Sequence, residues 1–101
     1  AKGRLREWVR AYLACVAFAD AQLGKVLDAL ESSPYRENTY IVVTSDHGYH
    51  LGEKLYAFKL SPWEESARVP LIAAGPGLPA GAEVSRPVSL IDLYPTFLEL
   101  A

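Results

Sequence analysis

The sequence predicts an α/β fold, with helices packed on a sheet. Apolar residues recur at spacings of three and four over residues 4–32, which predicts one long helix with a buried face. Two β-branched runs, residues 39–45 and 69–74, are apolar on both faces, as is typical of strands buried between helices in a parallel sheet. A second helical pattern covers residues 91–101. The order helix, strand, loop, strand, helix indicates a layered sheet.

The long helix carries one apolar stripe with a polar interruption. Ser32, Ser33 and Pro34 follow the stripe and predict the end of the helix. Asp20 interrupts the stripe, and a carboxylate on a buried face requires a partner, so we expect a structural hydrogen bond there. Cys15 lies in the same helix, where we expect a small buried hydrophobic residue. The stripe consists of Leu5, Trp8, Val9, Tyr12, Leu13, Val16, Leu23, Val26, Leu27 and Leu30.

Two shorter helices are expected to start at local capping signals. Ser61 is expected to be the N-cap of a short helix whose capping box is closed by Glu64. Asp92 or Ser89 is expected to cap the C-terminal helix, and Pro95 fits there because it falls near the first turn.

The composition is that of an ordinary globular protein. The 101 residues are 50% hydrophobic and 22% charged, with a net charge of −2, which excludes disordered and collagen-like chains and gives no footprint for nucleic acid. The longest apolar run, residues 11–19, is far shorter than the ~20 residues of a membrane span. The sequence leaves the cellular compartment open. Because the chain begins at Ala1 and stops at Ala101 within a helical pattern, we expect it to be part of a longer protein.

The residues most suggestive of chemistry follow the first predicted strand. Asp46 and His47 lie at its carboxyl end, which is where open α/β sheets bind ligands, and Gly48 allows a sharp turn. A carboxylate and an imidazole there can turn toward one cation; the alternative is a capping aspartate beside a surface histidine. Two ligands are too few for a complete site, because calcium takes ~6–8 oxygens.

Five segments together resemble the sulfatase family of the alkaline-phosphatase-like superfamily. In chain order they are YLACVAFADAQLGKVLDAL, TSDHGYHLGEK, Lys59, WEESARVPLIAAGPG and PVSLIDLYPTFLELA. The resemblance covers almost the whole chain. It implies that residues 1–101 are a fragment of one catalytic domain, part of a three-layer sandwich with a mostly parallel sheet flanked by helices. Residues 46–68 would then form the loop that binds metal and sulfate.

The resemblance assigns roles to individual residues of this loop. Asp46 matches the metal-binding aspartate of the family, and His47 matches the neighbouring ligand, which is asparagine in many members. Lys59 follows Asp46 by 13 residues and matches the lysine that holds the sulfate group in members with this histidine; the alternative is a solvated loop lysine. His50 and Lys54 could reach the substrate or could be ordinary loop residues.

The resemblance also implies a cofactor and a nucleophile. We expect one divalent cation, Ca²⁺ in most sulfatases, while the imidazole of His47 keeps Mn²⁺ open. Sulfatases attack with a formylglycine made from Cys or Ser in a C/S-x-P/A-x-R motif. Cys15, in LACVAF, does not fit that motif. We therefore expect the motif to be missing from this chain and to lie upstream, together with two further metal carboxylates.

These expectations define the function predicted from sequence. The chain contributes half a metal site and a sulfate-binding lysine to a sulfuric ester hydrolase acting on a small sulfate ester or a sulfated sugar. Its partner is the remainder of the catalytic domain, and alone it is expected to be inactive and prone to self-association. The alternatives are a phosphodiesterase or phosphonate monoester hydrolase of the same superfamily, or a non-catalytic fragment.

Overall fold

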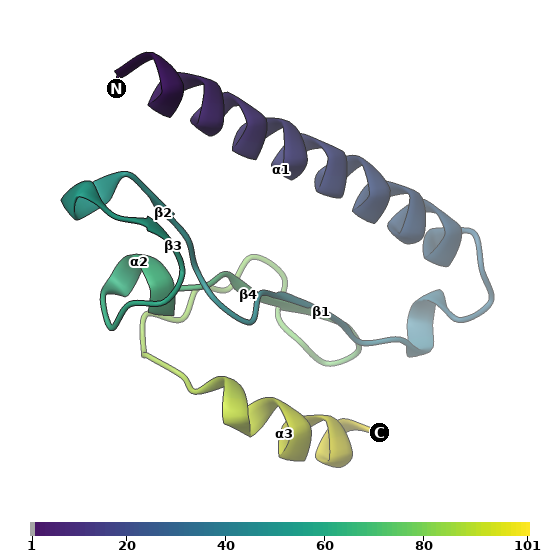
Figure 1. Cartoon of the computed structure of the whole chain (residues 1–101). Coiled ribbons are helices and arrows are strands. Elements are labelled where there is room, and N and C mark those ends of the chain that lie inside the picture. Colours follow the sequence, from purple (N-terminus) through teal and green to yellow (C-terminus); the bar gives the residue numbers. More distant parts are fainter. Residues whose placement is uncertain (1) are drawn as a thin grey trace.

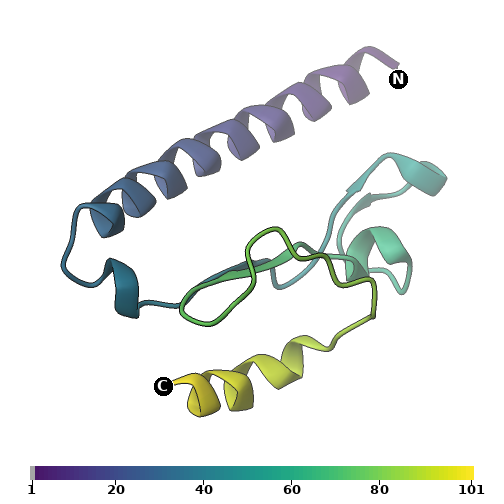
Figure 2. The same ribbon diagram turned by 180° about the vertical axis from the view of Figure 1, so that it is seen from behind.

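The computed structural model describes residues 2–101 and has three layers (Figures 1 and 2). A pair of strands, β1 (Ile41–Thr44) and β4 (Leu71–Ala74), forms the central layer. The long helix α1 (Lys2–Glu31) lies on one side of this pair, and α3 (Leu93–Leu100) lies on the other side in both views. The molecule measures 51 × 29 × 21 Å.

Helix α1 spans residues 2–31, where the apolar periodicity predicts a helix over residues 4–32. Its last turn closes through the backbone N–H of Ser32, which donates to the carbonyl of Asp28 at 3.1 Å. Pro34 then prevents continuation. Cys15 and Asp20 are both exposed, so the expectations of a buried thiol and a buried, paired carboxylate are wrong.

The central strands are antiparallel, and the predicted parallel arrangement is wrong for them. The register pairs Ile41 with Ala74 at one end and Thr44 with Leu71 at the other. A parallel pair needs a crossover of a dozen or more residues, usually a helix. The segment between β1 and β4 instead holds a hairpin and the four-residue helix α2 (Glu64–Ala67), so the chain returns alongside β1 in the opposite direction.

The hairpin consists of β2 (His50–Leu51) and β3 (Ala57–Phe58), which pair antiparallel. The turn between them contains Gly52 and the short 3₁₀ helix η2 (Glu53–Leu55). Three non-glycine residues of this hairpin adopt a left-handed backbone conformation, which is rare for bulky side chains. They are Lys54 (φ 54°), Leu55 (φ 57°) and Phe58 (φ 84°).

The predicted capping box between Ser61 and Glu64 does not form. Trp63, not Ser61, precedes α2 and makes no side-chain cap. At the C-terminal helix, the 3₁₀ turn η3 (Leu90–Asp92) leads into α3. Asp92 occupies the N-cap position of α3, but its side chain makes no capping hydrogen bond. A further 3₁₀ turn, η1 (Arg36–Asn38), leads into β1.

The described residues hold no buried hydrophobic side chain; only His50 and Ser66 are buried. The expectation of buried strands is therefore wrong, since every residue of β4 is exposed. An aromatic cluster joins α1 to the hairpin: the ring of Tyr49 lies 5.5 Å from Tyr12 and 5.7 Å from Trp8.

None of the helices described is both long and apolar enough to traverse a bilayer.

We predict that the isolated chain self-associates. Phe18 and Val26 on α1, and Ile72 on β4, are 68%, 65% and 59% exposed, and large apolar side chains exposed to water favour association. Sedimentation equilibrium should give an apparent mass that rises with concentration, and Phe18→Ser should lower it relative to the control Glu7→Gln. A monomeric mass across the accessible concentration range would contradict the prediction.

Candidate functional site

The carboxyl end of β1 carries the first two candidate residues, Asp46 and His47. The turn that follows β1 is held by the hydroxyl of Ser45, which donates to the carbonyl of His47 at 2.8 Å. The ring atom Nδ1 of His47 lies 2.8 Å from the carbonyl oxygen of Gly48. Because a carbonyl oxygen only accepts, Nδ1 carries the proton, and the lone pair of the neutral ring is on Nε2.

Lys59 lies against this lone pair. Its Nζ atom is 2.7 Å from Nε2 of His47 and donates a hydrogen bond to it. The same Nε2 atom is 3.5 Å from Oδ1 of Asp46. The structure therefore brings together the three residues for which the resemblance implies metal and sulfate binding, although Lys59 comes from the far end of the hairpin.

Asp46 and His47 are accessible donors with suitable chemistry for a divalent cation. The side chain of Asp46 is 84% exposed and that of His47 is 32% exposed. Carboxylate oxygen suits calcium and manganese, and imidazole nitrogen suits manganese and other transition metals. Within residues 2–101, no group of three or more His, Cys, Asp or Glu gathers as a complete metal site. The chemistry of these two donors suits a divalent cation, but two donors are too few for a complete site.

His50 has a different environment from the other candidates. It is completely buried, and its Nε2 atom lies 2.7 Å from the hydroxyl of Ser61. The ring packs edge-on against Tyr56 and Trp63, with ring centroids 5.1 and 5.6 Å away. The Ser61 hydroxyl is also hydrogen-bonded to the Ser66 hydroxyl at 2.9 Å. A buried imidazole offers no surface to a substrate, so His50 belongs to the framework of the loop.

The side chain of Lys54 contacts α2. Its Nζ atom donates to Oε1 of Glu65 at 2.7 Å and lies 5.1 Å from the ring centroid of Trp63. The hydrogen bond from Lys54 is the main reason that the pKa of the Glu65 carboxyl lies below its ordinary value. This pair ties the hairpin turn to α2.

Gly48 lets α2 approach the end of β1, a contact that the sequence did not predict. Its N–H donates to the carbonyl of Ser66 at 2.7 Å. A Cβ atom at this position would collide with the carbonyl oxygen of Glu65 and lie 2.9 Å from that of Arg68. Arg68 itself pairs with Glu64 at 3.3 Å.

One stretch of the sequence does fit the letters of the C/S-x-P/A-x-R motif, so the expectation that no match exists is wrong. It is residues 32–36, Ser-Ser-Pro-Tyr-Arg. It lies beyond the Ile41 end of the strand pair, opposite the end that carries Asp46 (Figure 1). The Ser32 hydroxyl donates to the carbonyl of Asp28 at 2.9 Å, as is common at a helix end.

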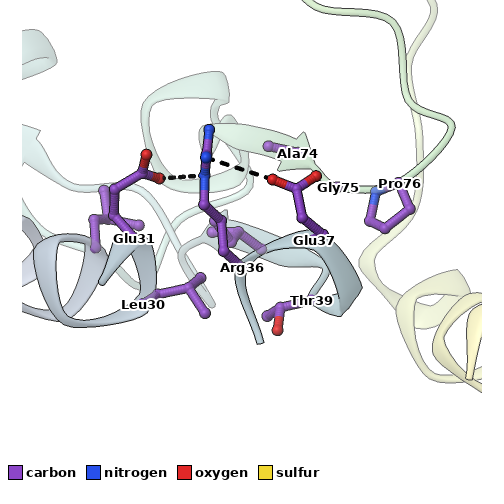
Figure 3. Close-up of a pocket in the computed structure, with 10 residues that line it drawn as sticks. Leu30, Glu31, Arg36, Glu37, Thr39, Ala74, Gly75 and Pro76 are labelled. Carbon is purple, nitrogen blue, oxygen red and sulfur yellow. Dashed lines mark ion pairs between the residues drawn. The ribbon is translucent and has the colours of Figure 1, made fainter. Parts of the chain in front are cut away.

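Arg36 of the same stretch borders a cavity of about 550 Å³ (Figure 3). Its guanidinium lies between two carboxylates, 2.8 Å from Glu31 and 3.5 Å from Glu37. Ile41 and Ala74, which pair at this end of the sheet, also line the cavity. The positive charge of Arg36 is therefore neutralised by the two adjacent carboxylates, and neither Arg36 nor Ser32 belongs to the cluster around Asp46.

Comparison with known proteins agrees with the resemblance to sulfatases. The sulfatase family model matches residues 2–101. The chain is 52% identical over 99 residues to a sulfatase of Formosa agariphila, covering 98% of this chain and 20% of that protein. It is 46% identical over 90 residues to arylsulfatase K of Danio rerio and 43% to that of Homo sapiens, covering 89% of this chain and 17% of each relative. The chain thus spans about a fifth of these relatives' length, and no solved structure gives a significant match.

Replacing Lys54 should return the Glu65 pKa toward its ordinary value. In Lys54→Gln the largest cause of the depression is gone, so the carboxyl should titrate at higher pH than in the unchanged chain. Carboxyl ¹³C NMR of glutamate-labelled chain measures this directly. Because the folded-state pKa is depressed, the link to α2 is stabilising above the ordinary value and should weaken as pH falls through the folded-state pKa. Lys25→Gln, which removes the same charge from α1, should leave the Glu65 titration unchanged.

We predict that Gly48→Ala separates the end of β1 from α2. The new methyl group would occupy the space of two backbone carbonyls, a clash that costs about 1–3 kcal/mol in a packed site. Gly77→Ala is the control, since a Cβ there meets nothing within 4 Å, although its φ of 76° adds a strain of its own. We expect faster exchange of the backbone amide at position 48 in the first variant only; equal exchange of this amide in both variants would contradict the close packing.

Proposed function

The chain belongs to the sulfatase family, and we propose that it supplies part of the catalytic site of a sulfuric ester hydrolase. In this proposal Asp46 and His47 are two of the ligands of a divalent cation, and Lys59 binds the sulfate group. The observation that supports it is the convergence of these side chains: Lys59 Nζ lies 2.7 Å from His47 Nε2, which lies 3.5 Å from Asp46 Oδ1. His47 and Lys59, which are 12 positions apart in the sequence, meet here.

Asp46 and His47 would hold the cation, which we propose to be Ca²⁺, with Mn²⁺ as the alternative favoured by the imidazole. The cation would supply positive charge to stabilise sulfate oxygens during ester cleavage. The hydrogen bond from Nδ1 to the Gly48 carbonyl fixes the tautomer of His47 and directs its Nε2 lone pair outward. Asp46 is held at the strand end by the turn that Ser45 closes.

Lys59 would bind the sulfate directly. An ammonium group has three N–H donors; one now serves Nε2 of His47, and coordination of the cation by that atom would free it, so that all three donors could serve sulfate oxygens. Lys59 is also exposed, so a sulfate ester can approach it from solvent. Its charge would stabilise negative charge that develops on the leaving oxygen and on the sulfate as the S–O bond breaks.

The rest of the reaction is assigned to residues outside this cluster. Formylglycine, the nucleophile implied by family membership, is proposed to come from outside the chain, because Ser32–Arg36 lies at the opposite end of the strand pair. A sulfate ester, either a small molecule or a sulfated sugar, is the proposed substrate class. The chain alone is therefore predicted to be inactive toward such esters.

The role of Lys59 can be tested in a chimaera. We define the chimaera as arylsulfatase K of Danio rerio in which this chain replaces the matching segment. Lys59→Ala in the chimaera should lower kcat/KM for 4-nitrophenyl sulfate by about 10²–10³-fold, the usual effect of removing one preorganised donor.

Lys25→Ala is the matched control, because it removes the same group from the exposed side of α1, where it pairs with Gln22 at 3.1 Å. This variant should keep the kcat/KM of the unchanged chimaera. Equal turnover by both lysine variants would remove Lys59 from the site.

A further inference from the structure

His50 anchors both ends of the short segment that carries Lys59. In the hairpin register the backbone of His50 pairs with Phe58, the residue just before Lys59. The side chain of His50 then reaches Ser61, two residues after Lys59, with Nε2 2.7 Å from the hydroxyl. The same buried residue therefore holds both ends of the four-residue segment 58–61.

The segment between these two anchors is tight and strained. Phe58 has a φ of 84°, a conformation that bulky side chains rarely adopt and that persists only when the surroundings enforce it. The N–H of Ser61 donates to the carbonyl of Lys59 at 3.0 Å, which closes a three-residue turn centred on Leu60 directly after Lys59. Tyr56, which packs against the His50 ring, also holds the carbonyl of Leu60 with its hydroxyl at 2.9 Å.

The partners of His50 define its protonation pattern. Its Nδ1 atom is buried without a hydrogen-bond partner among the described residues. A buried N–H without an acceptor is more costly than a buried lone pair, so Nδ1 is unprotonated and Nε2–H donates to Ser61. The Ser61 hydroxyl then accepts from His50 and from the N–H of Trp63, at 3.3 Å, and donates to Ser66. Every hydrogen-bonding position of this hydroxyl is used.

We propose that His50 is a positioning residue that, through Ser61, holds Lys59 against His47. This inference rests on the proposed function, in which Lys59 binds sulfate. His50 touches neither substrate nor metal; it acts by fixing the backbone on both sides of Lys59. The required feature of His50 is its Nε2–H donor, in the space that a glutamine amide nitrogen can also occupy.

A first test measures the contact itself. The chain has two histidines, so His50 variants leave His47 as the single ring in a ¹⁵N-histidine spectrum. In His50→Phe, which keeps a ring but loses the donor, the Nε2 resonance of His47 should shift to its position in the double variant His50→Phe/Lys59→Ala. In His50→Gln, which keeps the donor, Nε2 should stay near the wild-type position, and in His50→Asn, whose amide is too short, it should shift. An unmoved resonance in His50→Phe would overturn the proposal.

A second test uses kinetics in the chimaera. His50→Phe should lower kcat/KM for 4-nitrophenyl sulfate by about 100-fold, the effect of a misplacement of roughly 1 Å. The same substitution made on top of Lys59→Ala should lower kcat/KM no further, because His50 acts only through Lys59. Ser61→Ala, a milder change, should show the same two results. Glu64→Gln, which breaks an exposed pair on α2, should be neutral in both backgrounds.

The outcomes separate the two proposals. If Lys59→Ala itself leaves kcat/KM unchanged, the proposed function fails, and this inference fails with it. If Lys59→Ala lowers kcat/KM but His50→Phe and Ser61→Ala lower it by equal factors with and without Lys59, the two residues are merely structural and only the positioning role is overturned. Loss that is confined to the background with Lys59, and restored by His50→Gln, supports the assignment.

Discussion

The hydrogen bond from the Gly48 N–H to the Ser66 carbonyl is the contact on which the site depends. It joins the end of β1 to α2 and so closes the chain between residues 48 and 66 into a single loop. The hairpin lies inside this loop, and Asp46 and His47 lie immediately before it. A residue with a side chain at position 48 would prevent the contact, because the carbonyl oxygen of Glu65 occupies the space where its Cβ would lie. The hydrogen bond between Lys59 and His47 is possible because the two ends of the loop meet.

Local patterns predicted the helices better than they predicted the packing. The spacing of apolar residues gave α1 and α3 to within a few residues, because helix periodicity is a property of neighbouring positions. The strand pattern did not give direction, since the same β-branched runs suit parallel and antiparallel pairs, and the connection decided between them. Burial also failed: periodicity shows which face is apolar and cannot show whether another layer covers it.

At the candidate site, the family resemblance pointed to residues that the structure places close together, whereas the match of residues 32–36 to the nucleophile motif was misleading. The distance of 13 positions between Asp46 and Lys59 fits a hairpin that returns to the end of its strand, and the structure places Lys59 there. The five letters of Ser32–Arg36 fit a nucleophile motif, yet they lie at the wrong end of the strand pair, with Arg36 held between Glu31 and Glu37. Ser61 was expected to cap α2 but serves the buried His50 instead, because hydroxyl groups bond whichever partner the fold brings close.

The hydrogen bond between Lys59 and His47 also constrains how the proposed site can work. A neutral imidazole has one lone pair, here on Nε2, and that atom can serve either the lysine or a metal ion but not both. In the proposed site, coordination through Nε2 leaves Lys59 without its present acceptor. Its ammonium group would then have three free donors, and the sulfate group of the proposed substrate would be an acceptor that could replace the imidazole. A flexible lysine released in this way would lose its alignment in solvent, and the anchors at Phe58 and Ser61 keep its backbone in place when the side chain changes partner.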